Sequence, residues 1–345
     1  MVQRIFVHVG MPKCASSTIQ GTLWQNRDVL AEMGIQYGLY AEEDAQLQGN
    51  GASLAHAIWC DDTDAADRRI NYFMSLGDRV LISAEAFSNV FNSGGTGRMF
   101  REMRARGAEV RVINFLRRQD LWIESDYKQQ IKGGHPWTSP IEDLIAQRRA
   151  QEVFNLAWTM AYWEKFADFK NTHAVALNPG QPKDYPLRAL WDFIGLTPAQ
   201  QGRLTVHPDA NISPPAGLIE PARLLKKALI AEGVPDARVR EILGDFFTRA
   251  PQQITVPARR FVMTHDARTE LMAYCAPSNA ALTRRFTATQ RFDPVIAEDP
   301  ASEIPLEPEA QAIFWTWAKT LPELARMRRR RLFSMGPLAL LRRKT

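Results

Sequence analysis

The sequence contains few cysteines and no spacing typical of a metal site. Its 345 residues include three cysteines, which stand far apart at Cys14, Cys60 and Cys275, and six histidines scattered along the chain. Such widely spaced cysteines disfavour a disulfide framework, and the sequence has none of the C-x-x-C or H-x-x-x-H patterns that mark structural zinc. We therefore expect a chain that folds without disulfide bonds and uses no metal ion.

The sequence also lacks a long apolar segment. No run of about 18 apolar residues is present, so we expect no transmembrane helix. The N-terminus lacks the basic stretch and apolar core of a signal peptide, because residues 4–9 already have the pattern of a strand. Together these absences predict a cytoplasmic protein.

Acidic residues are missing from the C-terminal end. The formal net charge is +5, and no aspartate or glutamate follows Glu323, whereas eight basic residues do: Arg326, Arg328, Arg329, Arg330, Arg331, Arg342, Arg343 and Lys344. Removing these eight charges from +5 leaves −3 for the rest, which disfavours nucleic-acid binding by the body of the chain. The mostly apolar stretch 332–341 between two basic clusters predicts a peripheral contact of the tail with the inner face of a membrane. The alternatives are a solubilising tail or an amphipathic stretch docked on the core.

Four short apolar runs alternate with helical patterns. We expect strands at 4–9, 79–83, 110–116 and 173–177, with helices between them, including one continuous helix over 16–33. This order predicts an α/β fold, a mostly parallel sheet with helices on both faces. Beyond residue 208 only helices are expected, at 218–232, 236–247, 268–274, 278–286 and 309–327. The chain thus divides into an α/β core over 1–205, a helical extension packed on it over 206–325, and the basic tail at 326–345.

The segment after the first strand has the features of an anion-binding loop. A strand ends at Val9, a short loop runs from Gly10 to Ala15, and a helix starts at Ser16. In this geometry several backbone N–H groups and the positive end of the helix point at one position, to which Lys13 adds a charge. The loop is P-loop-like, but it does not meet the ATP-binding pattern, because no glycine directly precedes Lys13 and Cys14 follows it.

The loop resembles the 5′-phosphosulfate loop of sulfotransferases that use 3′-phosphoadenosine 5′-phosphosulfate (PAPS), whose usual form is P-K-[TS]-G-T-[TS]. The matching residues are Pro12, Lys13, Cys14, Ala15, Ser16 and Ser17, followed by Thr18. The resemblance implies that they bind the 5′-phosphosulfate. Ala15 stands where the family has glycine, and we expect alanine to fit only if its φ angle stays negative. The alternative is an ordinary strand-to-helix connection capped by Ser16.

A second segment resembles the 3′-phosphate motif of the same family, an arginine at the end of a strand and a serine eight residues later on the next helix. Arg117 and Ser125 have this spacing. An arginine suits a phosphate because its planar fork forms paired, charge-assisted hydrogen bonds. Arg118 is a weaker competitor for the same phosphate. The alternative is that Arg117 forms a structural salt bridge with Asp120 or Glu124.

Three further segments are similar to bacterial, carbohydrate-type sulfotransferase-like proteins. They are L-R-R-Q-D-x-W-x-E-S-x-Y over 116–127, Asn211-Ile212-Ser213-Pro214 and Ser278-Asn279-Ala280. The resemblance implies transfer of a sulfuryl group from PAPS to an acceptor hydroxyl, with 3′,5′-diphosphoadenosine (PAP) as the product. It also implies a small-molecule or glycan acceptor, with a saccharide favoured.

The resemblance further implies roles in the reaction. Lys13 is placed to stabilise the bridging oxygen as PAP leaves. Glu85 follows the second strand, where a side chain points into the crevice in which such folds bind ligands, and it is our candidate base. His8 is the rival base, and Cys14 is interpreted as a loop donor rather than as a reactive thiol. A P-loop small-molecule kinase and a non-catalytic nucleotide- or glycan-binding module are the alternative functions.

Overall fold

The structure, a computed structural model, describes residues 2–40, 49–90, 94–134, 136–207, 213–286, 291–304 and 307–327. Within these residues it has an α/β fold, in which helices flank a four-stranded parallel sheet, so the coarse fold class is confirmed. The basic tail beyond Met327, on which the membrane contact was predicted, lies outside the described residues. So do Asn211 and Ile212 of the N-I-S-P segment.

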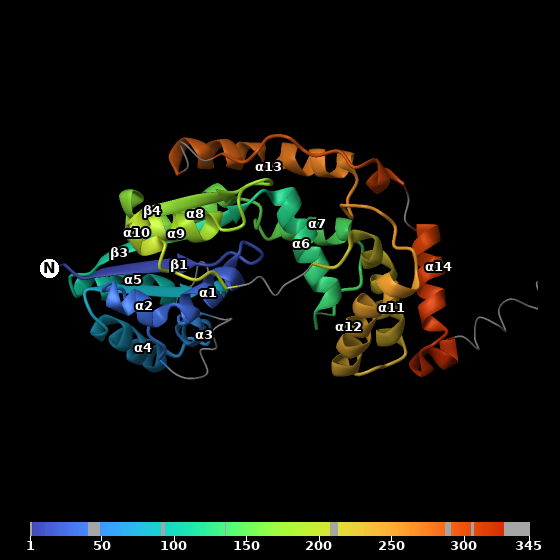
Figure 1. The fold of residues 1–345 in the computed structure, drawn as a ribbon, viewed down its shortest axis with the longest axis horizontal. Coiled ribbons are helices and arrows are strands. Elements are labelled where there is room, and N and C mark those ends of the chain that lie inside the picture. Colours follow the sequence, from blue (N-terminus) through green and yellow to red (C-terminus); the bar gives the residue numbers. More distant parts are fainter. Residues whose placement is uncertain are drawn as a thin grey trace, which may run out of the picture. The chain divides into compact units, whose positions relative to one another are not determined.

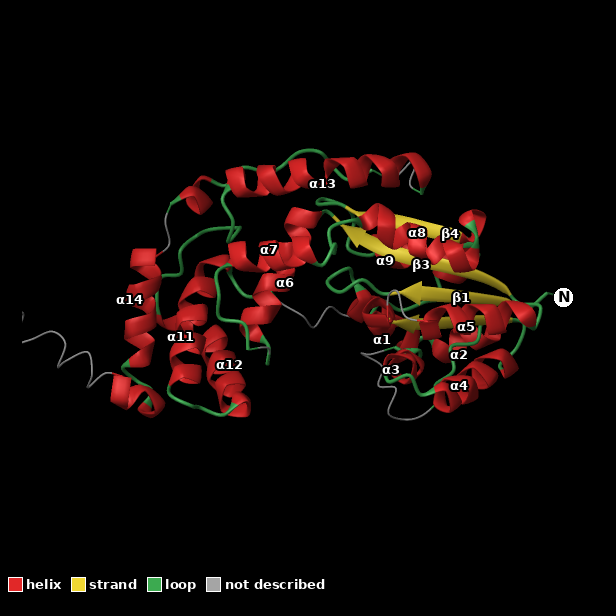
Figure 2. Cartoon of the chain, turned by 180° about the vertical axis from the view of Figure 1, so that it is seen from behind, coloured by secondary structure: helices red, strands yellow, loops and turns green. Residues whose placement is uncertain are grey.

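The sheet consists of β1 (Arg4–Val9), β2 (Arg79–Ala84), β3 (Glu109–Arg117) and β4 (Thr172–Leu177). The strand order is β2-β1-β3-β4, and all three neighbouring pairs are parallel (Figure 2). His8 of β1 pairs with Ser83 of β2 and with Ile113 of β3. The strands read as continuous apolar runs because both faces of the sheet are covered. The four predicted strands are confirmed, with ends that differ by one residue at most.

Two sets of helices cover the sheet. One apolar core contains the sheet residues Ile5, Val7, Ile82 and Val112 and side chains of α3 (Ala52–Trp59), α4 (Thr63–Ser75), α5 (Gly94–Ala105) and α8 (Leu156–Ala167). Further helices contact the sheet: α1 (Ser16–Gln25) lies against β2, and α9 (Tyr185–Phe193) lies against β3 and β4. The short α10 (Pro198–Gln201) follows α9.

The continuous helix expected over 16–33 is wrong, because the chain breaks at Asn26 between α1 and α2 (Arg27–Glu32). The Asn26 amide donates to the carbonyls of Thr22 and Thr205, both at 2.7 Å, and accepts from the Thr205 N–H at 2.9 Å. A buried asparagine that binds backbone groups competes with the helix ladder. The break therefore depends on a segment 179 residues away, which periodicity cannot reveal.

The chain forms two compact units, each built from several segments. The first comprises residues 1–122, 152–211 and 272–295, and the second comprises 123–151, 212–271 and 296–345. The second unit contains α7 (Ile141–Ala150), α11 (Ile219–Ala231), α12 (Asp236–Gln253) and α14 (Glu307–Ala318), coloured from green to red in Figure 1. Two helices pass from one unit into the other, α6 (Gln119–Lys132) and α13 (His265–Arg285). This division differs from the expected boundary near residue 205. Residues 123–151, expected in the α/β core, belong to the second unit, and residues 272–295, expected in the helical extension, belong to the first.

Four of the helices predicted in the C-terminal half need correction. The helices expected at 268–274 and 278–286 form one helix, α13, which continues through Pro277. Helix α12 runs on to Gln253 through Pro251, and α14 ends at Ala318 rather than near residue 327. A proline removes only one helical hydrogen bond, and tertiary packing can offset that cost. No helix of the described segments is long and apolar enough to cross a membrane.

Candidate functional site

The predicted anion loop lies at the position where the strand order of the sheet reverses direction. In the strand order β2-β1-β3-β4, the chain passes from β1 outward to β2 at one edge of the sheet and from β3 outward to β4 at the other edge. The central neighbours β1 and β3 therefore flank the switch point. In open α/β sheets, ligands bind outside the carboxyl ends of the strands at such a point. The loop 10–15 follows β1, and Arg117 is the last residue of β3. The topology thus brings the predicted anion loop and Arg117 to the same edge of the sheet in the first unit.

The loop approaches the end of β2 very closely. The Gly10 N–H donates to the Ala84 carbonyl at 3.0 Å, and a Cβ at Gly10 would lie 2.8 Å from Glu85 Cα and 2.9 Å from Ser16 Oγ. Any side chain here would force the loop away from Glu85. Glycine at position 10 therefore brings the loop, the start of α1 and the end of β2 together.

The backbone of the loop is strained at two non-glycine residues. Lys13 and Ala15 have φ angles of 63° and 65°, in the left-handed region. The condition on which alanine was expected to fit, a negative φ angle, is therefore not met: Ala15 occupies the glycine position of the family pattern with the positive φ angle that glycine would adopt. Such residues cost about 1–3 kcal/mol each and occur mainly where the surrounding structure over-determines them, often at ligand sites. Alternating backbone conformations of this kind turn successive N–H groups towards one position, as in anion-binding nests.

The first turn of α1 has no cap of its own. Its N-cap residue is Ala15, no side chain caps the helix, and its first turn holds no acidic residue. The alternative of a connection capped by Ser16 does not hold, because no side chain caps α1, and the Ser16 hydroxyl hydrogen-bonds to the Met11 carbonyl at 3.3 Å and to the Glu85 carboxyl. Uncapped N–H groups at a helix start are suited to a negatively charged ligand.

Glu85 lies in direct electrostatic contact with the loop. Burial raises the pKa of its carboxyl, while the Lys13 ammonium and the hydrogen bond from Ser16 act in the opposite direction. Ser16 is almost completely buried, whereas Ser17 and Thr18 are half-buried. Ser16 thus orients Glu85, and the hydroxyls with access to solvent are those of Ser17 and Thr18. Pro12 contributes its carbonyl, which accepts a hydrogen bond from the Trp122 indole at 2.8 Å.

His8 is fully buried inside the sheet. Its Nδ1 lies 2.8 Å from Ser83 Oγ, and its ring packs edge-on against Phe115. Burial lowers the pKa of the imidazole to about 3, so the ring stays neutral near pH 7. A base must reach the proton that it removes, and its pKa should lie near the working pH. The geometry therefore favours Glu85 over His8.

Cys14 is buried and its thiol is not activated. Burial raises the pKa of the thiol to about 12, although the Arg117 charge and a hydrogen bond from the Arg117 backbone N–H act in the opposite direction. The position at a helix start, which commonly lowers a thiol pKa, is outweighed by desolvation. These interactions do show that Cys14 of the loop and Arg117 of β3 are neighbours.

The structure separates the two adjacent arginines by role. Arg118 is buried and binds both carboxylate oxygens of Asp120, at 2.7 and 3.0 Å, and it also donates to the carbonyls of Asp293 and Val295. Arg117 is half-buried and, among the described residues, its side chain has no ion-pair or hydrogen-bond partner. The structural salt bridge considered for Arg117 thus belongs to Arg118.

The other residues of the 116–127 segment also have structural partners. Gln119 and Asn279 exchange two amide hydrogen bonds, at 2.7 and 3.0 Å, within the first unit. In the second unit the Glu124 carboxylate accepts from the N–H groups of Val262 and Met263, and burial raises its pKa. These contacts could not be predicted from local sequence patterns, although Gln119, Glu124 and Asn279 all stand in the segments that carry the resemblance. Ser125 is half-buried on α6 and belongs to the second unit, whereas Arg117 belongs to the first.

Comparisons with known proteins add no relative to this description. The searches found no family model, no curated protein and no solved structure that matches the chain. Among the described residues, no group of three or more His, Cys, Asp or Glu side chains could hold a metal ion.

Proposed function

We propose that the chain is a sulfotransferase that moves a sulfuryl group from PAPS to an acceptor hydroxyl. The observation that carries the proposal is the arrangement at the switch point. An uncapped helix start and Lys13 follow β1, Glu85 follows β2, and Arg117 ends β3, where its side chain has no ion-pair or hydrogen-bond partner among the described residues. Two cations and a set of backbone N–H groups suit a ligand with two separate anionic groups. PAPS is such a ligand, since it carries a 5′-phosphosulfate and a 3′-phosphate.

The P-loop-like segment takes the 5′-phosphosulfate in this proposal. The N–H groups of residues 13–17 and the hydroxyls of Ser17 and Thr18 hold the 5′ end, and Lys13 neutralises charge on the bridging oxygen. Arg117 binds the 3′-phosphate at the end of β3. That phosphate distinguishes PAPS from ATP, so Arg117 sets the choice of nucleotide.

Glu85 acts as the general base. The oxygen of the acceptor hydroxyl attacks sulfur, the bond between sulfur and the bridging oxygen breaks, and the electrons of that bond leave with PAP. The hydroxyl proton goes to the Glu85 carboxylate. A carboxyl whose pKa is raised by burial accepts this proton more readily than an exposed one, and Lys13 keeps enough of it ionised. The reaction then depends chiefly on positioning and electrostatics, as in phosphoryl transfer.

Nucleotide binding tests the proposal directly. Calorimetric titration should show that PAP binds tighter than 5′-AMP and tighter than ATP, and a radiolabelled assay should detect transfer of the sulfuryl group from PAPS to an acceptor from a glycan panel. PAP binding no tighter than that of 5′-AMP would overturn the assignment. Preferential ATP binding with phosphoryl transfer would instead establish the small-molecule kinase, and PAP binding without transfer to any acceptor would favour the non-catalytic module.

Three variants separate the roles. Arg117→Ala should weaken PAP binding about 10- to 100-fold, since it removes charge-assisted hydrogen bonds, and should leave 5′-AMP binding nearly unchanged. Lys13→Ala should reduce turnover more than PAP affinity. Glu85→Gln should reduce turnover about 10²- to 10⁴-fold with PAP affinity preserved. Arg104→Ala, which removes an exposed arginine paired with Asp168 at 3.1 Å, is the matched control and should behave as the wild type.

A further inference from the structure

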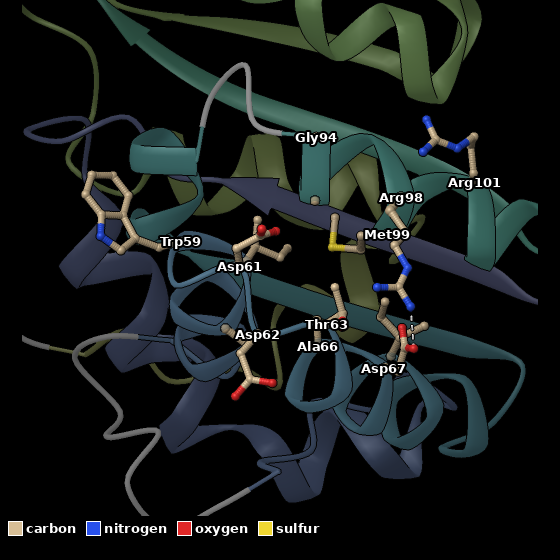
Figure 3. A pocket seen from close by; sticks show the side chains of 14 residues that line it. Trp59, Asp61, Asp62, Thr63, Ala66, Asp67, Gly94, Arg98, Met99 and Arg101 are labelled. Atoms are coloured by element: carbon tan, nitrogen blue, oxygen red, sulfur yellow. Dashed lines mark hydrogen bonds and ion pairs between the residues drawn. The ribbon is translucent and has the colours of Figure 1, made fainter.

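A pocket of about 560 Å³ lies in the first unit, between the turn that joins α3 to α4 and the start of α5. Figure 3 shows Trp59 at one end, Arg98 with Asp67 at the other, and Asp61 and Met99 between them. The pocket is separate from the residues assigned above to the nucleotide, none of which lines it.

The pocket has an apolar floor and a polar rim. Ile58, Ala66, Ile70 and Met99 form the apolar part of the lining, which we call the floor, and are all buried, with Ile70 and Met99 only 1% exposed. The polar side chains at the rim are largely exposed. Pockets for small ligands usually combine apolar walls with a few placed polar groups. A ligand that presents C–H groups on one side and hydroxyls at its edge would fit this division.

Trp59 is the most distinctive side chain at the rim. It is the last residue of α3, and 65% of it is exposed. Tryptophan side chains are usually largely buried, so this exposure is unusual. When exposed, a tryptophan offers a ligand a large, rigid apolar face at a small cost in conformational entropy. An indole face beside a cavity can stack against the C–H face of a pyranose ring.

Two acidic residues stand in the turn between α3 and α4. Asp62 caps α4 by accepting from the Ala65 N–H at 2.9 Å, and Asp61 has a φ angle of 55°, which aspartate tolerates better than most residues. Gly95 allows α5 to approach α3, since a Cβ there would lie 2.9 Å from Ile58. Asp62 is thus engaged by the helix start, whereas the exposed Asp61 carboxylate at the rim is an acceptor for a hydroxyl group.

The charge of the lining selects the class of ligand. Arg98 pairs with Asp67, so these two charges cancel. The other charged lining residues are Asp61, Asp62 and Arg101, so the lining carries one net negative charge. Such a rim favours uncharged polyhydroxylated ligands and repels polyanions.

We propose that this pocket binds a neutral saccharide, with the Trp59 indole against one ring face and Asp61 accepting from ring hydroxyls. The proposal goes beyond sulfuryl transfer and stands without it, because it concerns saccharide binding at residues that take no part in the reaction. A saccharide held here would anchor an unsulfated glycan to the first unit. The ligand class is set by the pocket's own apolar floor, indole and net charge.

Calorimetric titration of the full chain with neutral tetrasaccharides derived from cellulose, maltose and chitin, and with a heparin-derived tetrasaccharide, tests the proposal. At least one neutral tetrasaccharide should bind, and the heparin fragment should bind much more weakly at this pocket. Trp59→Ala should weaken neutral saccharide binding at least tenfold, and Asp61→Asn, which keeps the backbone preference, should weaken it severalfold. Trp158→Ala, which removes another exposed tryptophan of the same unit, is the control and should bind as the wild type.

The outcomes are distinct from those of the nucleotide experiments. Failure of every neutral tetrasaccharide to bind, or equal binding by the wild type and Trp59→Ala, would overturn the saccharide pocket even if PAP binds. Conversely, saccharide binding lost in Trp59→Ala would support the pocket even if PAP does not bind. Circular dichroism of the variants confirms folding, which both substitutions should leave intact because the two residues are exposed.

Discussion

Ala15 offers a sharp test of the loop conformation. Its φ angle of 65° places an alanine in the left-handed region, at the position where the resembling family has glycine. For a residue with a Cβ, that conformation costs about 1–2 kcal/mol, because the Cβ crowds the carbonyl oxygen. Ala15→Gly removes the strain but adds about 0.4–1 kcal/mol of conformational freedom to the unfolded chain. The net expectation is stabilisation by about 0.5–1 kcal/mol.

Urea unfolding monitored by tryptophan fluorescence measures this effect. For a slope of about 3 kcal/mol/M, the midpoint of Ala15→Gly should rise by about 0.2–0.3 M. Ala189→Gly is the matched control, since the same substitution lies within α9 of the same unit, where glycine should cost about 1 kcal/mol. The two variants should therefore move the midpoint in opposite directions.

The result that would refute the reasoning is a loss of stability in Ala15→Gly similar to that in Ala189→Gly. Such a loss would mean that Ala15 has a negative φ angle and that the loop is unstrained. PAP titration adds a second readout, because glycine keeps the left-handed geometry. The affinity of Ala15→Gly for PAP should equal or exceed that of the wild type, and a large loss would contradict the proposed nest.

Three further predictions follow from buried groups. The pKa of His8 in the folded state, about 3, lies below its ordinary value of 6.5, so the unfolded state binds more protons between these two values and the free energy of unfolding falls as the pH drops through this window. The loss should reach about 2 kcal/mol near pH 5. Urea unfolding at neutral and acidic pH should show a smaller loss in His8→Asn than in the wild type. Arg118→Met should destabilise the chain by about 3–5 kcal/mol, since it leaves a buried carboxylate without its partner, whereas Arg117→Met should change the urea midpoint little; equal effects would contradict the division of roles. In the native protein, a thiol reagent should modify the exposed Cys60 quickly and the buried Cys14 only on unfolding, and rapid modification of both would show that Cys14 is activated after all.

Local patterns predicted much of the fold. The four strands, the loop after β1 and most helices of the first unit lie where apolar periodicity and glycine positions placed them. The errors have a common cause. The break at Asn26 depends on Thr205, and α13 runs on through Pro277, so in each case packing overrides a local signal.

The sequence by itself determined that a lysine-bearing loop follows a buried strand and that an arginine and a glutamate end two others. Residue types and strand patterns are local properties, and they carry this information directly. Only the tertiary structure decided which of Arg117 and Arg118 is engaged by protein groups, because the partners of Arg118 at Asp293 and Val295 lie 175 and 177 residues further along the chain. It also decided that His8 is desolvated, that Ser16 binds Glu85, and that Ala15 has a positive φ angle. These three properties depend on the packing of β1, β2 and β3 side by side. Strand pairing places residues next to each other that are far apart in the sequence, so local patterns cannot reveal these contacts.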